Sequence, residues 1–129
     1  MVIQFCNGLL FTSIQVTFRG ASKVINNIVI DTGAAETIIS PDVVEEIGVI
    51  AELEDNISSF YGIGGSLQNF FSKRVDQINF YGIILKDLKI DFGIIDLEGN
   101  INGLLGFDLL MKVGAVIDLE KLTLTVRNL

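Results

Sequence analysis

The most informative part of the sequence is Val29-Ile30-Asp31-Thr32-Gly33-Ala34. In this stretch a carboxylate directly follows an apolar run that is typical of a buried strand, and small residues follow the carboxylate. Taken alone, Asp-Thr-Gly is also a common turn at a strand end. The rest of the chain must distinguish an ordinary turn from a functional carboxylate.

The composition excludes several other kinds of catalytic chemistry. The 129 residues include no histidine and one cysteine, which excludes a histidine-dependent nucleophilic triad and any histidine-based metal site. Carboxylates are therefore the natural catalytic groups, and we expect neither a metal nor another cofactor. The net charge of −7 argues against a nucleic-acid partner, because phosphates bind lysine and arginine.

Half of the residues are apolar and 19% are charged, which favours one globular domain over residues 1–129. No apolar stretch approaches the ~18 residues that a membrane-spanning helix needs. The first residues lack the basic region and cleavage site of a signal peptide, and Cys6 alone cannot form an internal disulfide. We therefore predict a cytoplasmic protein without membrane association.

Glycines separate short apolar segments, and this pattern predicts a mostly β chain with one or two short helices. Strands are expected at 2–5, 13–18, 24–30, 77–84, 88–94, 101–106, 115–118 and 122–126. A hairpin is expected at 57–70, with a glycine-rich tip at 62–66. Helices are expected at 40–48, with Ser40 as N-cap, and at 107–113.

A pair of carboxylates could hydrolyse a peptide bond with water. Two carboxylates about 3 Å apart share one proton, so one can accept a proton while the other donates one. Gly33 would let two backbones approach closely because it has no Cβ, and the Thr32 hydroxyl could hold the loop rigid. The chain carries one such motif.

Three segments, in this order, resemble retropepsin-like aspartic proteases. The first is Val29 to Ala34 followed by Thr37-Ile38-Ile39, which resembles the active-site segment. Gly62-Ile63-Gly64-Gly65 resembles the tip of the flap, and Gly103-Leu104-Leu105-Gly106 resembles the apolar strand beside the active site. The resemblance implies a closed β-barrel acid-protease fold and a homodimer, since the active site needs two Asp-Thr-Gly motifs.

The resemblance also implies roles for individual residues. Asp31 would be the catalytic residue of an aspartic endopeptidase, paired with Asp31 of a second subunit. An extended peptide or protein substrate would add to the flap like an extra strand. The supporting residues would be Thr32, Gly33 and Ala34 around the carboxylate, Tyr61, Gly62, Ile63, Gly64 and Gly65 in the flap, and Ile38, Leu104, Leu105 and Gly106 at the cleft wall.

Two positions depart from the retroviral pattern. Retroviral members carry an acid directly after Asp-Thr-Gly-Ala, whereas this chain has Ala35 followed by Glu36. They also carry Arg-Asn after the second glycine motif, where the arginine helps to brace the dimer, and here Phe107-Asp108 stands instead. At this second position, the sequence Phe107-Asp108 resembles that of cellular and bacterial members of the family. We expect Asp108 to be an acid at a helix N-terminus rather than a catalytic group.

Other readings remain open. The chain could be a non-catalytic peptide-binding or dimerisation module on the same fold, or an unrelated small β-barrel with a fortuitous turn. The terminal strands could pair across a dimer or form an internal edge. Lys73-Arg74 is expected to be a solvated strand edge, and Asp91, Asp96 and Asp118 are expected to be turn or surface acids.

Overall fold

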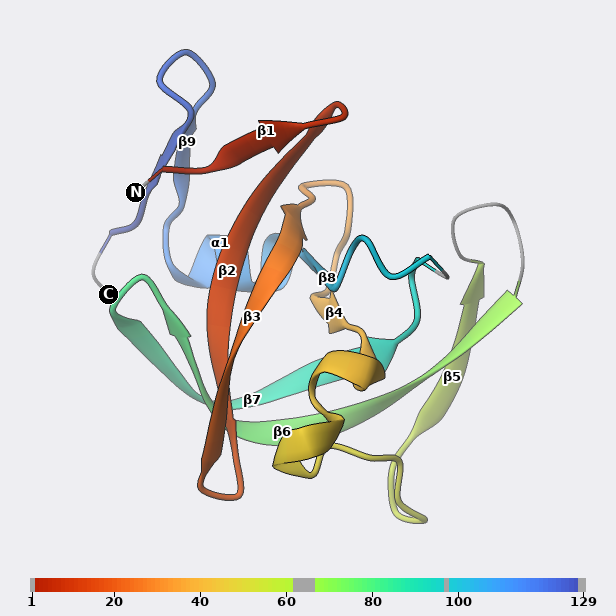
Figure 1. The fold of residues 1–129 in the computed structure, drawn as a ribbon. Coiled ribbons are helices and arrows are strands. Elements are labelled where there is room, and N and C mark those ends of the chain that lie inside the picture. The colour runs from red at the N-terminus through yellow and green to blue at the C-terminus, as the bar shows by residue number, and fades with distance from the viewer. Residues whose placement is uncertain (1, 62–66, 97, 128–129) are drawn as a thin grey trace.

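The computed structural model describes residues 2–61, 67–96 and 98–127. Eight strands form one sheet in the order β1-β2-β3-β8-β4-β7-β6-β5 (Figure 1). An additional pairing between β2 and β6 closes six of these strands into a ring. Strands β1 and β5 lie outside that ring, at the two ends of the sheet. The predicted closed, mainly β barrel is therefore confirmed.

The strands of this sheet are β1 (Gln4–Cys6), β2 (Leu9–Phe18), β3 (Ala21–Ile30), β4 (Ile38–Ile39), β5 (Ile57–Tyr61), β6 (Leu67–Phe80), β7 (Ile83–Gly93) and β8 (Gly103–Leu105). A separate two-stranded sheet contains β9 (Val116–Asp118) and β10 (Thr123–Thr125). The helical elements are the 3₁₀ turns η1 (Pro41–Val43) and η2 (Glu45–Ile47) and the helix α1 (Phe107–Lys112). None of the helices in the described ranges is long and apolar enough to cross a membrane.

The barrel core follows from alternation along β2. Ile14, Val16 and Phe18 point inward and are buried, as the sequence pattern predicts. Their neighbours in the core come from every strand of the ring and from α1. The barrel is thus filled by side chains rather than hollow.

The strand predicted at 77–84 is wrong, because a turn interrupts it. Tyr81 and Gly82 both have positive φ, 53° and 88°, and they join β6 to β7 as a two-residue hairpin. The Asn79 side chain accepts the Gly82 N–H at 2.9 Å and stabilises this turn. Residues 86–87, which fall between the strands expected at 77–84 and 88–94, lie inside β7.

The helix predicted at 40–48 is replaced by η1 and η2. Val44 separates them with a φ of −120°, and its side chain is fully buried. Consecutive β-branched residues at 43–44 disfavour a continuous helix, and burial of Val44 fixes the break. Ser40 occupies the N-cap position but makes no side-chain cap bond, and Gly48 ends η2 with a φ of 91°, as predicted.

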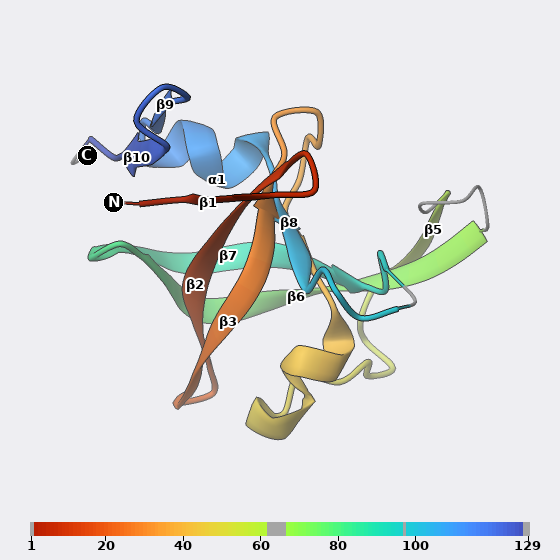
Figure 2. The ribbon, with the colours of Figure 1, turned by 45° about the horizontal axis from the view of Figure 1, so that its top comes forward.

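The strands that surround the loop after β3 come from distant parts of the chain. β3 pairs with β8 in parallel, and β8 pairs with β4 in antiparallel orientation; β3 and β8 lie side by side in Figure 2. A Cβ at Gly103 would lie 2.8 Å from both Ile28 Cδ1 and the Ile38 carbonyl oxygen, so glycine permits this crossing. The loop between β3 and β4 consequently lies against the end of β8.

The segments near the two ends of the chain lie side by side and are hydrogen-bonded to each other. Val2 pairs with Thr123, and the Ile3 N–H donates to the Leu122 carbonyl at 3.0 Å. β1 then pairs with β2. Both terminal segments therefore have strand partners inside this chain, and β1 is one of the two edge strands of the main sheet.

Candidate active site

Asp31 lies just beyond the end of β3 and is partly exposed. Its N–H donates to the Leu105 carbonyl at 3.0 Å, which joins the loop to β8. Its Oδ1 accepts the Gly33 N–H at 2.9 Å, and its carbonyl accepts the Ala34 N–H at 3.2 Å. A tight turn thus orients the carboxylate. A Cβ at residue 33 would lie 3.1 Å from Oδ1, so glycine leaves it room.

The residues after Asp31 form an exposed surface. Thr32 and Gly33 are exposed in the single chain, and Ala34 is partly exposed. The Ala34 carbonyl accepts the Phe107 N–H at 2.8 Å, which ties the loop to the start of α1. Backbone hydrogen bonds to β8 and α1 therefore fix this loop, while the carboxylate and its neighbours remain accessible to solvent.

Hydrogen bonds between Thr37 and Asp108 link this loop to α1. The Thr37 N–H donates to both Asp108 carboxylate oxygens, at 3.0 and 3.1 Å, and its Oγ1 donates to Oδ1 at 2.7 Å. Thr37 Oγ1 also accepts the Gly106 N–H at 3.0 Å. Since Thr37 is buried, these bonds satisfy groups that would otherwise be costly.

The prediction for Asp108 was incomplete. It lies in the first turn of α1, as expected, and accepts the Leu109 N–H at 2.8 Å. Its second role, as acceptor for Thr37, was missed because the two residues are separated by 71 positions. A local acid pattern gives no indication of which distant loop folds against the helix start.

Gly106 brings β8 and α1 into contact with the loop. A Cβ there would lie 2.7 Å from the Glu36 carbonyl carbon and 2.8 Å from the Ala34 carbonyl oxygen. Real Cβ atoms do not approach backbone atoms this closely, so steric exclusion explains why the second glycine motif ends in glycine. This approach brings the two predicted motifs together.

The side chains predicted at the cleft wall divide into two groups. Ile38 and Leu104 are cross-strand partners and remain partly exposed. Leu105 is fully buried and packs in the barrel core, because it alternates with Leu104 along β8. Leu105 therefore contributes to the core, and its side chain does not reach the surface of the chain.

The predicted hairpin is confirmed as β5 paired with β6, from Ile57↔Phe71 to Tyr61↔Leu67. It extends away from the barrel in Figure 1. Tyr61 is the last residue of β5. Gly62, Ile63, Gly64 and Gly65 lie outside the described residues.

Of the acids predicted to be turn or surface groups, two are confirmed and one is not. Asp96 accepts three backbone N–H groups of the loop at 98–101, and Asp118 accepts two at 120–121. Asp91 is instead buried in β7, where it accepts the Ser72 hydroxyl at 2.7 Å. The prediction failed because the neighbours of Asp91 come from other elements.

Asp91 also interacts with Glu36. The hydrogen bond that protonated Glu36 donates to Asp91, the repulsion between the two carboxylates and burial raise the pKa of Glu36 above its ordinary 4.5. Both carboxyl groups line a cavity of about 310 Å³ next to the loop. The remaining lining residues are Thr37, Arg74, Asp87, Leu88, Lys89, Asp108, Leu109 and Lys112.

The prediction of a solvated edge at Lys73-Arg74 holds for one of the two residues. Arg74 is exposed and pairs with Asp87 at 3.3 Å. Lys73 is buried and lies 2.7 Å from each of two carboxylate oxygens, on Glu52 and Asp55. The sequence did not predict that Glu52 and Asp55 pair with Lys73. These acids approach the lysine only when β6 folds against the segment before β5.

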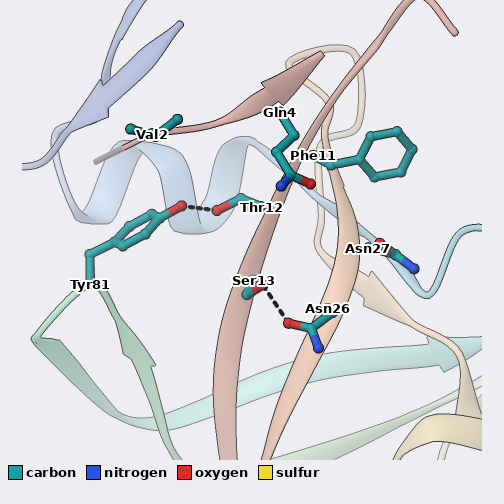
Figure 3. A pocket seen from close by; sticks show the side chains of 8 residues that line it. All are labelled: Val2, Gln4, Phe11, Thr12, Ser13, Asn26, Asn27 and Tyr81. Carbon is teal, nitrogen blue, oxygen red and sulfur yellow. Dashed lines mark hydrogen bonds between the residues drawn. The ribbon is translucent and has the colours of Figure 1, made fainter. Parts of the chain in front are cut away.

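A further cavity, of about 480 Å³, lies between β1, β2, β3 and the β6–β7 turn (Figure 3). The Tyr81 hydroxyl bonds Thr12 Oγ1 across it, and Ser13 Oγ donates to Asn26 Oδ1 at 2.7 Å. Its lining is uncharged: Val2, Gln4, Phe11, Thr12, Ser13, Asn26, Asn27 and Tyr81. None of these residues belongs to the predicted active site.

Within the described ranges, no group of three or more acidic, cysteine or histidine side chains is arranged to hold a metal ion. The Asp31 carboxylate is thus oriented by the Gly33 N–H, on a loop that is braced by α1 and β8.

The pattern shared by the aspartyl protease family matches residues 14–109, from β2 to α1. The chain belongs to the aspartyl protease family. A search of curated protein sequences finds no match.

Solved structures of retropepsin-like proteins share the fold. The retroviral protease-like domain of Ddi1 from Leishmania major superposes with a TM-score of 0.64 at 16% identity, over 94% of this chain and 90% of that one. A retropepsin-like aspartic protease from Rickettsia conorii gives 0.59 at 19% identity, over 91% and 82%. The EIAV protease, solved with the inhibitor HBY-793, gives 0.61 at 19% identity, over 92% and 100%. The predicted retropepsin-like fold is therefore confirmed.

Proposed function

We propose that this protein is an aspartic endopeptidase whose active site forms between two copies of the chain. Each copy would supply one Asp31, and the two-fold axis would pass between the two carboxylates. The orientation of Asp31 carries the proposal: the carboxylate lies at an open surface with Oδ1 bonded to the Gly33 N–H. Membership of the aspartyl protease family supports the same reaction class.

The reaction needs two carboxyl groups in different protonation states. At a separation of about 3 Å both cannot be ionised, so the pair holds one proton. The ionised carboxylate takes a proton from water as the water oxygen attacks the scissile carbonyl carbon. The protonated carboxyl stabilises the developing oxyanion and then supplies a proton for departure of the amine.

The other predicted residues surround this centre. Thr32 would bond across the dimer beneath the carboxylates, and Gly33 and Ala34 would form the cleft floor. Ile38 and Leu104, which are partly exposed, would contact substrate side chains. The hairpin of β5 and β6 would take up an extended peptide by strand addition.

The single domain over residues 1–129 stays a prediction.

Asp31→Asn tests the proposal. We expect the variant to remain folded and to lose proteolysis of a denatured protein by about 1,000-fold or more. Asp42→Asn, at an exposed acid in η1, is the matched control and should cleave like the unaltered protein. Activity should be greatest at mildly acidic pH, where the pair holds one proton. Undiminished cleavage by Asp31→Asn would exclude this role.

A non-catalytic peptide-binding or dimerisation module is the second candidate. Ala35 and Phe107 favour it, because they replace charged residues of retroviral enzymes. Under this reading, peptides bind to the protein and are released intact at every pH, and Asp31→Asn leaves their affinity unchanged.

A further inference from the structure

Lys73 and Asp91 are the two charged residues that are buried among the described residues, each with 7% of its surface exposed. Lys73 lies on β6 with 5% of its side chain exposed. Its Nζ lies 2.7 Å from Glu52 Oε1 and 2.7 Å from Asp55 Oδ2, and the Asp55 side chain is 10% exposed. We refer to Lys73, Glu52 and Asp55 together as the Lys73 anchor. The mechanism proposed above uses none of them.

The charges of the Lys73 anchor are balanced. Arg19 supplies a second cation, 2.9 Å from Glu52 Oε1, so two cations meet two carboxylates. Both cations also lie over the Phe18 ring, at 4.7 Å for Arg19 and 5.9 Å for Lys73. This pairing compensates for the cost of removing the charged lysine from water.

The ion pairs shift the pKa values of all three groups toward their charged forms. Burial lowers the pKa of Lys73, but the hydrogen bonds that Lys73 donates to Asp55 and Glu52, together with the attraction of their charges, more than offset this, so its pKa is raised. Burial raises the pKa of Asp55, but the hydrogen bonds from Lys73 and from the Glu52 N–H, together with the nearby positive charges, lower it by more. The Lys73 bond lowers the pKa of Glu52. The anchor therefore stays charged at the mildly acidic pH that a shared-proton pair requires.

The Lys73 anchor fixes the segment that leads into β5. Asp55 Oδ2 accepts the Glu52 N–H at 2.7 Å, and the Asp55 N–H donates to the Glu52 carbonyl at 3.0 Å, which closes a small turn. One residue later, the Asn56 carbonyl accepts the Ser72 N–H at 3.2 Å. β5 begins at Ile57. The lysine thus ties the chain to β6 directly before the hairpin starts.

The hairpin depends on this attachment because β5 is an edge strand. Among the described residues β5 pairs with β6 alone, and the pairing of β6 with β7 ends at Phe70↔Gly93. Beyond that point the hairpin is a two-stranded ribbon, from Ser59↔Asn69 to Tyr61↔Leu67. An isolated two-stranded ribbon has little stability of its own. Its direction must be set at its base.

We propose that Lys73 is a positioning residue for substrate binding, which it serves by holding the base of the β5–β6 hairpin through Glu52 and Asp55. The inference rests on the proposed function, in which this hairpin takes up the peptide. Lys73 does not contact the reacting atoms. Its loss should therefore change the binding of substrate more than the rate of the chemical step.

The test compares three variants in the full chain. Lys73→Met leaves Asp55 without its cation and Glu52 paired with Arg19 alone, and it should lower the Tm. The triple variant Lys73→Met, Glu52→Gln, Asp55→Asn removes the buried charges together and should recover most of the Tm. Arg74→Met, at the exposed neighbouring residue on β6, is the matched control. The probe is a peptide chosen from the cleavage products of a denatured protein.

A purely structural role and a positioning role give different results in the triple variant. We expect its KM to stay raised about five-fold or more while kcat changes less than about two-fold. Amide hydrogen exchange across residues 57–61 should also be faster than in Arg74→Met. A triple variant with the KM and exchange rates of the unaltered protein would overturn the proposal. If the unaltered protein cleaves nothing, the proposed function fails, and the exchange comparison still tests the anchor.

Discussion

Asp108 shows how one side chain can hold two distant segments in register. Its carboxylate receives the Thr37 N–H and hydroxyl from the loop after Asp31 and the Leu109 N–H from its own helix. The retroviral enzymes have Arg-Asn at this position, and here Phe107-Asp108 takes its place. An acid with three donors therefore braces the loop without an arginine.

Asp108→Ala tests the value of this brace. Removing the acceptor leaves buried Thr37 donors without a partner, which should lower the free energy of unfolding by about 2–3 kcal/mol. Asp108→Asn keeps an acceptor oxygen and should lose less. Urea denaturation measures both, and equal stabilities for the alanine variant and the unaltered protein would contradict the assignment.

Glu36 gives a prediction about pH. Its pKa is raised in the folded state, chiefly by its hydrogen bond to and repulsion from Asp91, with Asp108 adding to the effect and Lys89 opposing it. A raised carboxyl pKa means that protonated Glu36 stabilises the folded state. This contribution to the free energy of unfolding is present at low pH and is lost as the pH rises from about 4.5 through the folded-state pKa. Glu36→Gln cannot ionise, so its stability should not show this loss.

The measurement is the Tm of Glu36→Gln minus that of the unaltered protein, followed from pH 4 upward. We expect the difference to grow in favour of the variant as the pH rises. Glu45→Gln, at an exposed acid in η2, should show no such trend. A difference that stays constant with pH would show that Glu36 titrates normally.

At the scale of elements, periodicity in the sequence predicted most of the barrel. β2, β3, α1 and the β9–β10 pair follow from alternating or capped patterns that depend on local residues. The β6–β7 turn was missed because Tyr81, a residue that rarely adopts positive φ, takes part in it. The continuous helix was wrong because burial of Val44 outweighed the capping pattern.

The same distinction holds for the site. The position of Asp31 after a buried strand and the need for two glycines could be predicted, since both are properties of short segments. The partners of Asp91, Lys73 and Asp108 could not. Each of these side chains meets a group that is distant in sequence, and no local pattern specifies that contact.

Gly106→Ala tests the close approach of elements at the site. The added Cβ would lie 2.7–2.8 Å from the backbone of residues 34 and 36, so β8 and the loop must separate. We expect a loss of about 2 kcal/mol or more in unfolding free energy, because packed backbone cannot yield cheaply. Chemical denaturation measures it.

Gly99→Ala is a useful comparison for this variant. Residue 99 has open space but a φ of 77°, so its cost is backbone strain of about 1 kcal/mol without a clash. Equal or smaller destabilisation by Gly106→Ala would contradict the steric argument.

At the scale of the whole molecule, the proposed dimer places Phe107 at an interface. Its N–H bonds the Ala34 carbonyl, and 47% of its surface is exposed in the single chain. If two Asp31 side chains form one pair, groups bonded to their loops lie close to the two-fold axis. An exposed phenylalanine there should be covered by the second copy.

Phe107→Glu should therefore weaken the dimer by about ten-fold or more, because the carboxylate would lose its hydration at the interface. Sedimentation velocity over a dilution series measures the dissociation constant. Leu53→Glu, at an exposed leucine before β5, is the control and should dimerise normally. A dimer of unchanged affinity in Phe107→Glu would place the interface elsewhere.

The parallel pairing of β3 with β8 also has a consequence during synthesis of the chain. Ile30, which precedes the carboxylate, pairs with Leu105, so the support beneath Asp31 is made long after Asp31 itself. Contacts between such distant positions form late, once the intervening chain exists. On the proposed function, a nascent polypeptide in which Leu105 has not yet emerged cannot cut its neighbours, and proteolysis begins only after this segment has been made and has paired with β3.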